Sequence, residues 1–224
     1  MLAALFPAGV ATAELRGAAS PDLLHPAELE HGRGFAPTRL RDYAAGRLCA
    51  RHALGELGVA GFPLEPDEGG RPRWPQGMVG SITHTKGFCG AAVARRRQLR
   101  GIGLDAEAVD RVTAEIWPQI CTPGESAWLR SLPSAAQARA AALIFSGKET
   151  FYKCCAPAAG RWVDFPDVEV TLQGPLVGEG SFAIAPIGEI GWHIPAGTAL
   201  GGRYRFDGGV VVTAMALPLR PGAP

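Results

Sequence analysis

The sequence predicts an α+β fold made of two halves that meet near residues 101–105. Its 224 residues can form one large domain or two small ones, and 47 % of them are hydrophobic, enough to fill a sizeable core. Along the chain, a strand pattern precedes one helix and three strands, and further helices and strands follow. We therefore expect an N-terminal half over 1–102 and a C-terminal half over 103–224.

In the first half, the clearest element is a helix over Thr38–Gly58. It follows a proline, carries leucine or tyrosine at helical intervals, and ends at a glycine, the residue that most often follows a helix. The Pro- and Gly-rich stretch 61–77 predicts a loop. Four strands are expected around these two segments, at Gly9–Leu15, Met78–Thr83, Phe88–Ala94 and Leu99–Asp105.

In the second half, two capping boxes predict helix starts. Thr122-Pro-Gly-Glu125 has proline at the first helical position and opens a helix to about Ser131. Ser134-Ala-Ala-Gln137 has the same pattern and opens a long, alanine-rich helix to about Cys155. A short helix is also expected at Val112–Pro118. The remainder predicts strands separated by turns, at Val168–Gln173, Ser181–Ala185, Arg203–Phe206 and Val210–Leu217.

Charge and composition argue against several classes of protein. The formal net charge of +1 gives no field that would steer nucleic acid or an anionic membrane, and no apolar run is long enough to span a bilayer. The apolar start, Met1–Leu15, could be a signal peptide, but it has no basic beginning and is interrupted by proline and glycine, so a first strand is favoured. Five cysteines without metal-binding spacing favour a reduced, cytoplasmic protein.

The strongest local feature is Gly101-Ile-Gly-Leu-Asp105-Ala-Glu107. Residues two apart on a strand point to the same face, so Asp105 and Glu107 would lie side by side. Two neighbouring carboxylates repel unless a cation or proton lies between them, and Mg²⁺ prefers such oxygen ligands. The pattern is also common on solvated strand edges. Its Gly-x-Gly lacks the third glycine and following helix of a dinucleotide loop.

The second feature is Phe145-Ser-Gly-Lys148-Glu149-Thr-Phe-Tyr152-Lys153 on the long helix. Glu149 and Lys153 are four apart with the acid first, a favourable helical pair that is often a simple surface salt bridge. The functional interpretation makes Glu149 a third metal carboxylate and uses Lys148 and Lys153 to neutralise a phosphate. Gly147 is unusual here, because glycine costs up to ~1 kcal/mol in a helix interior.

The third feature is a set of basic and hydroxyl residues in the first half. Arg47 and Arg51 are four apart, so both project from one helix face. A basic loop, Gly70-Arg71-Pro-Arg73-Trp74-Pro75, precedes Gly80-Ser-Ile-Thr83-His84-Thr85 at the end of a strand. Hydroxyls, backbone amides and a cation suit phosphate binding, although a lone histidine more commonly has a structural role.

Together these segments resemble the Sfp-type 4′-phosphopantetheinyl transferases, in the branch that contains enterobactin synthetase component D. The matching pieces occur in order between residues 47 and 153, about half of the chain, and no piece after Pro157 can be aligned. The resemblance implies that Asp105, Glu107 and Glu149 bind the metal. It also implies that Glu149 takes the proton of the acceptor serine.

The resemblance implies further roles for basic residues. Lys153 would steady a diphosphate, with Lys148 beside it. The remaining residues implied as contacts to coenzyme A are Arg47, Arg51, Arg71, Thr83 and His84. The implied fold is a pair of similar α/β halves about a pseudo-twofold axis.

The implied activity is Mg²⁺-dependent transfer of phosphopantetheine from coenzyme A to a serine of an apo acyl or peptidyl carrier protein by a monomer. Siderophore, other nonribosomal peptide and polyketide carriers all suit it. Two alternatives stay open. A Mg²⁺-dependent hydrolase of coenzyme A or of a nucleotide could use the same acids. A degenerate nucleotide-binding partner subunit would lack one of the carboxylates.

Overall fold

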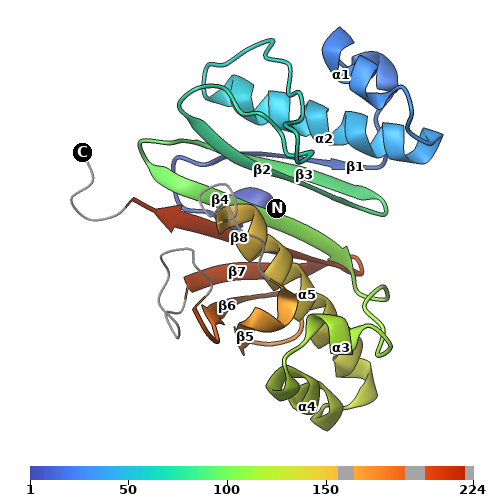
Figure 1. Cartoon of the computed structure of the whole chain (residues 1–224), viewed down its shortest axis with the longest axis vertical. Coiled ribbons are helices and arrows are strands. Elements are labelled where there is room, and N and C mark those ends of the chain that lie inside the picture. The colour runs from blue at the N-terminus through green and yellow to red at the C-terminus, as the bar shows by residue number, and fades with distance from the viewer. Residues whose placement is uncertain (156–163, 190–199, 220–224) are drawn as a thin grey trace. The chain divides into compact units, whose positions relative to one another are not determined.

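The computed structural model of the chain describes residues 1–155, 164–189 and 200–219 (Figure 1). The chain divides into two compact units. The first contains Met1–Ile102 and the described residues from Leu217 onward, and the second contains Gly103–Ala216. Both units combine helices with β-sheet, so the chain has the predicted α+β fold. Within the described residues, no helix is both long and apolar enough to cross a bilayer.

The first unit is a long helix packed on a three-stranded antiparallel sheet. The sheet has the order β1-β3-β2. Its strands are β1 (Ala11–Arg16), β2 (Met78–Thr85) and β3 (Phe88–Arg95), and its helices are α1 (Pro26–Gly32) and α2 (Pro37–Glu56). Short 3-10 turns, η1 (Leu2–Leu5) and η2 (Pro21–Leu23), flank β1.

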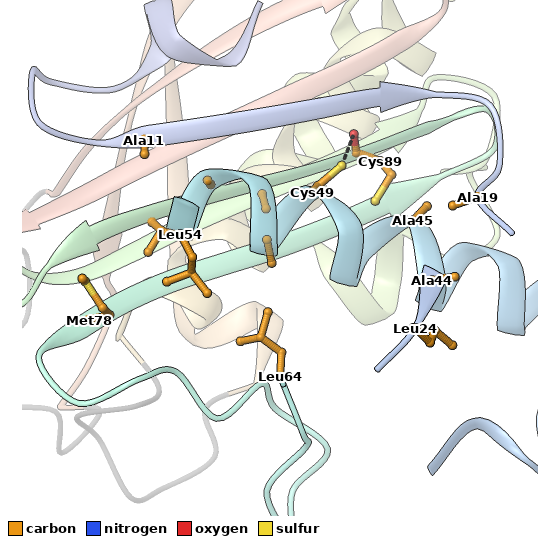
Figure 2. Close-up of a cluster of buried hydrophobic side chains, with 14 residues drawn as sticks. Ala11, Ala19, Leu24, Ala44, Ala45, Cys49, Leu54, Leu64, Met78 and Cys89 are labelled. Atoms are coloured by element: carbon orange, nitrogen blue, oxygen red, sulfur yellow. Dashed lines mark hydrogen bonds between the residues drawn. The ribbon is translucent and has the colours of Figure 1, made fainter. Parts of the chain in front are cut away.

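Small side chains let α2 lie close to its sheet. The core between them contains Ala45, Cys49 and Leu54 of the helix with Cys89 of β3 and Met78 of β2 (Figure 2). The helix ends where the sequence predicts, because Gly58 just beyond it has a φ of +80°, a conformation that glycine adopts without steric cost.

The second unit has a longer helix beside a five-stranded sheet of order β4-β8-β7-β6-β5 (Figure 1). The strands are β4 (Leu99–Ala108), β5 (Val168–Gln173), β6 (Glu179–Pro186), β7 (Leu200–Asp207) and β8 (Val210–Pro218). The helices are α3 (Trp117–Ile120), α4 (Pro123–Ser131) and α5 (Ser134–Cys155), and the 3-10 turn η4 (Phe165–Asp167) precedes β5. Helix α5 packs against β5 and β6.

The element predictions are confirmed with two corrections. The short helix expected at Val112–Pro118 is α3, which begins only at Trp117. Ser134 does not open a capping box: it is already helical, and Gln137 donates its side-chain Nε2 to the Leu132 carbonyl at 3.0 Å. By contrast, the Thr122–Glu125 capping box forms as predicted.

Candidate active site

Helix α5 and strand β4 touch through their backbones at Gly103. A Cβ atom added to Gly103 would lie 2.0 Å from the Thr150 carbonyl oxygen and 2.9 Å from Cys154 Cβ. Only a residue without a side chain permits this approach. Because alternate residues of a strand share a face, Asp105 and Glu107 lie on the same side of β4 as Gly103, the side that faces α5.

Asp105 of β4 meets Lys153 of α5 in an ion pair. The Lys153 Nζ lies 2.6 Å from Asp105 Oδ1, and the aspartate side chain is only 5 % exposed. Burial disfavours the charged ammonium, but Asp105, Glu149 and Glu107 outweigh it and raise the pKa of Lys153. Strand β4 and helix α5 thus bring together Asp105 and Lys153, an acidic and a basic residue that the sequence analysis selected.

Glu107 and Glu149 share the electric field of that ion pair. Burial and the charge of Asp105 raise the pKa of Glu107 to about 7. Burial also raises the pKa of Glu149, against the opposing effect of Lys153. As they stand, the described side chains include no set of three His, Cys, Asp or Glu residues grouped to hold a metal ion. The predicted metal role of these acids therefore stays a prediction.

Aromatic rings support this turn of α5 from the side. Phe145 and Tyr152 lie two turns apart on the same face of the helix. Both pack against Phe165 of η4, with ring centroids 5.4 and 5.2 Å from the Phe165 ring. Gly147 needs no close approach, because a Cβ there would meet Phe182 at 3.4 Å, an ordinary contact distance.

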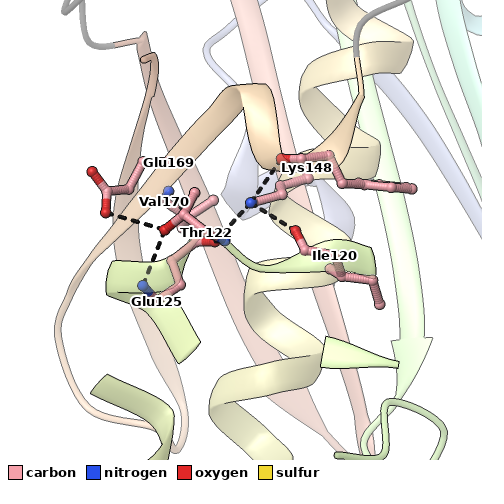
Figure 3. A network of polar contacts seen from close by, with 7 residues as sticks. Ile120, Thr122, Glu125, Lys148, Glu169 and Val170 are labelled. Carbon is pink, nitrogen blue, oxygen red and sulfur yellow. Dashed lines mark hydrogen bonds and ion pairs between the residues drawn. The ribbon is translucent and has the colours of Figure 1, made fainter. Parts of the chain in front are cut away.

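Lys148, which the sequence analysis predicts to bind phosphate, directs its ammonium group to partners inside the protein. Its side chain is wholly buried, and Nζ donates to Glu125 Oε2 at 2.7 Å and to the carbonyls of Ile120 and Phe165 at 2.9 Å (Figure 3). An ammonium group has three donors, so none remains for a ligand. Burial lowers the pKa of Lys148, and Glu125 opposes that shift.

Glu125 completes this buried network. Its Oε2 also accepts from the Thr122 amide at 2.8 Å, which closes the capping box of α4, and its Oε1 accepts from the Val170 amide of β5 at 2.7 Å (Figure 3). One carboxylate therefore ties α4, β5 and α5 together. We call Glu125, Lys148 and their partners the Glu125–Lys148 network.

The three arginines predicted to bind phosphate all have partners inside the first unit. Arg47 is buried, donates Nε to the Leu64 carbonyl at 3.0 Å, and stacks its guanidinium 4.1 Å above the Tyr43 ring. Arg51 pairs with the buried Glu28. Arg71 forms an exposed pair with Asp67 at 2.9 Å, which a ligand could replace at little cost.

Thr83 and His84 lie where the sequence predicts, near the end of β2. Thr83 is buried and His84 is exposed. Since consecutive residues of a strand point to opposite faces, the two side chains do not share a face of the sheet. Their predicted contacts with coenzyme A stay predictions.

Comparison with known proteins identifies the family. A family model described as the 4′-phosphopantetheinyl transferase N-terminal domain matches residues 30–94, and one described as the 4′-phosphopantetheinyl transferase superfamily matches residues 101–186. The 4′-phosphopantetheinyl transferase Svp of Streptomyces mobaraensis is 36 % identical to the chain, over 99 % of the chain and 91 % of its own length. The chain belongs to the 4′-phosphopantetheinyl transferase family.

Other relatives support the same assignment. The 4′-phosphopantetheinyl transferase Npt of Nocardia iowensis is 35 % identical over 96 % of the chain and 99 % of its own length. Enterobactin synthase component D of Salmonella typhi is 35 % identical over 59 % of the chain and 55 % of its own length. The predicted family and its enterobactin branch are thus confirmed. The chain is a transferase enzyme, and nothing in these matches supports the alternative of a hydrolase.

Two residues that shape this transferase's site were absent from the predicted set. Gly103 was available as a signal, since an isolated glycine in a strand pattern is typical of close backbone approach. Glu125 was visible only as the third helical residue of a capping box. Its burial and its pairing with Lys148 depend on contacts 23 residues apart in the chain.

Proposed function

We propose that this transferase moves the 4′-phosphopantetheine group of coenzyme A onto a serine of an apo acyl or peptidyl carrier protein and releases 3′,5′-ADP. The observation that carries the proposal is the pairing of Lys153 with Asp105 beside Glu107 and Glu149. A diphosphate needs cations to neutralise it, and a hydroxyl nucleophile needs a base. An ammonium and three carboxylates supply both kinds of group.

Glu149 and Lys153 are assigned different roles because their charges are opposite. Glu149 would accept the proton of the serine hydroxyl, and the raised pKa of its carboxyl makes it a stronger base than an exposed glutamate. The serine oxygen forms a bond to the β-phosphorus while the bond from that phosphorus to the bridging oxygen breaks. The bridging oxygen leaves as part of 3′,5′-ADP. Lys153 would neutralise charge on the diphosphate.

Asp105, Glu107 and Glu149 would hold magnesium. Carboxylate oxygens are its preferred protein ligands, and burial, with a smaller effect of the Asp105 charge, raises the pKa of Glu107 and of Glu149, so a cation among these acids would be favourable. When bound, magnesium supplies further neutralisation of the diphosphate.

Contacts to the rest of coenzyme A are proposed for Arg47, Arg71, Thr83 and His84 in the first unit. The exposed position of Arg71 and His84 supports their availability to a ligand. The carrier served would belong to siderophore, other nonribosomal peptide or polyketide synthesis, which the similarity to enterobactin synthase component D supports. All five cysteines are free thiols, which suits the cytoplasm, and we expect a monomer.

Intact-mass analysis tests the proposal directly. Purified apo carrier protein, the transferase, coenzyme A and Mg²⁺ are incubated together, and the carrier should gain one phosphopantetheine group. Incubation without carrier separates transfer from hydrolysis, because a hydrolase would consume coenzyme A alone.

The base assignment needs a variant and a matched control. Glu149→Gln keeps the shape of the side chain and removes its basicity, so we expect a loss of about 10²–10⁴-fold in kcat. Glu115→Gln changes a glutamate exposed to solvent in the same unit and should leave kcat unaltered. Equal rates for the two variants would remove Glu149 from the base role.

A further inference from the structure

Two buried glutamates, one in each unit, make the same set of contacts. Glu28 is the third helical residue of a capping box in α1, as Glu125 is in α4. Glu28 Oε2 accepts from the His25 amide at 2.8 Å and from the Arg51 guanidinium, and its Oε1 accepts from the Leu64 amide at 2.9 Å.

The correspondence with Glu125 holds atom by atom. In both units, Oε2 closes the capping box and pairs with a cation of the long helix, while Oε1 accepts from a backbone amide beyond that helix. In both units the cation lies 23 residues after the glutamate. Arg51 of α2 therefore occupies the position in its unit that Lys148 of α5 occupies in the other.

We infer that Lys148 and Arg51 are equivalent positioning residues that hold the long helices of the two units, and that neither is a phosphate ligand. The inference rests on the proposed function, since what Lys148 positions is the pair Glu149 and Lys153. It also revises the role that the family resemblance implies for Arg51.

The contacts explain how Lys148 positions its neighbours. Its ammonium joins the helix to Glu125, to the carbonyl at the end of α3 and to the carbonyl of Phe165 in η4. Three anchors around one residue fix both the rotation and the height of that turn of α5. Glu149 follows directly in the chain, so a rotation of the turn would change the position of its carboxylate relative to Asp105, whose charge acts on it.

Burial shows why a ligand role is excluded. Glu125 and Lys148 are 3 % and 0 % exposed, so exchanging the pair for contacts with a phosphate would leave an isolated carboxylate inside the protein. Such a charge is strongly unfavourable without its partner. Glu28 is likewise 0 % exposed, so withdrawing Arg51, itself 20 % exposed, from this pair would also leave an isolated buried carboxylate.

The test compares Lys148→Met with the double variant Glu125→Gln/Lys148→Met. Lys148→Met should lower the Tm by about 10 °C, because it leaves a buried charge unpaired. It should also lower kcat about 10- to 100-fold through misplacement of Glu149. The double variant removes the isolated charge and should recover most of the Tm and part of kcat, a coupling that a phosphate ligand would not show.

The salt dependence of coenzyme A binding separates a positioning role from a ligand role. Loss of a direct ion pair to phosphate makes binding less sensitive to salt, whereas loss of a positioning residue does not. We therefore expect Lys148→Met and Arg51→Met to keep the wild-type salt slope in calorimetric titrations with coenzyme A. Arg139→Met, at an exposed position of α5, the helix that carries Lys148, is the matched control. It should change neither the Tm, nor kcat, nor the salt slope.

Hydrogen exchange gives a readout that does not depend on turnover. Amides of residues 146–153 should exchange faster in Lys148→Met and return toward the wild-type rate in the double variant. If Lys148→Met does not fold, Lys148→Arg keeps the charge but cannot fit three acceptors arranged for an ammonium, and should lower kcat with an unaltered salt slope.

A reduced salt slope in either variant, or normal kcat and exchange in a folded Lys148→Met, would overturn the inference. Failure of the proposed function is recognised separately, because the wild-type enzyme would then not modify the carrier.

Discussion

The contact between Gly103 and Thr150 leads to a quantitative prediction for Gly103→Ala. The new Cβ would lie 2.0 Å from the Thr150 carbonyl oxygen, and folded proteins keep such atoms at least 3.0 Å apart, so β4 and α5 must separate by about 1.0 Å. Overpacking of this kind costs ~1–3 kcal/mol, and the nearest contact is the backbone carbonyl of Thr150, which cannot rotate away as a side chain can, so we expect the upper value. For a chain of this length, that lowers the Tm by about 10 °C.

The same displacement should impair catalysis. Asp105 is carried by the strand and Lys153 by the helix, so a shift of about 1 Å changes their geometry and should reduce kcat about 10²-fold. Thermal unfolding and carrier-modification kinetics measure the two effects.

Gly147→Ala is the matched control, because its Cβ would meet Phe182 at 3.4 Å and alanine favours the helix by up to ~1 kcal/mol. Its Tm should stay level or rise. A Gly103→Ala enzyme with wild-type Tm and kcat would show that the close approach is not needed.

Three further changes give distinct outcomes. Because the pKa of Glu107 is raised to about 7, the folded protein keeps a proton that the unfolded chain releases above about pH 4.5. The free energy of unfolding without metal should therefore fall as pH rises from about 4.5 to 7. Glu107→Gln should flatten that slope in denaturant titrations. The rise in Tm on adding Mg²⁺ should be greater at pH 8 than at pH 6, and Asp105→Asn should reduce it at both values; an equal rise in that variant would exclude Asp105 as a ligand. Thr213→Val should cost about 1–3 kcal/mol in urea unfolding, because the buried hydroxyls of Ser146 and Thr150, 2.8 and 2.6 Å from Thr213 Oγ1, lose their shared partner; a loss under 0.5 kcal/mol would contradict this.

Local signals in the sequence predicted the elements of the fold well. Pro37 and Gly58 mark the two ends of α2, and the Thr122–Glu125 capping box marks the start of α4. Each signal acts within a few residues, so it can be recognised without knowing the tertiary structure. Ser134 shows the limit: its pattern matches a capping box, but the helix already begins there and Gln137 bonds to Leu132 instead.

The candidate site was predictable in part, because chemical type can be read from the sequence and burial cannot. Asp105 and Lys153 were selected by residue type and spacing, and the structure brings them within 2.6 Å. By residue type and spacing, Lys148 matched a phosphate ligand equally well. The inference against that role rests on Glu125, a partner 23 residues away whose carboxylate also accepts a hydrogen bond from the Val170 amide. No sequence periodicity links these positions.

The Glu125 carboxylate has a second consequence, which concerns self-association. Strand β5 forms one end of the five-stranded sheet, where main-chain groups of an end strand can pair with a strand of another molecule. The Val170 amide is already occupied by Glu125 Oε1 at 2.7 Å, so a side chain fills the position that an incoming strand would use. Glu125→Ala, which lacks an oxygen to accept from the Val170 amide, should therefore aggregate through intermolecular β-structure when warmed, before the rest of the unit unfolds.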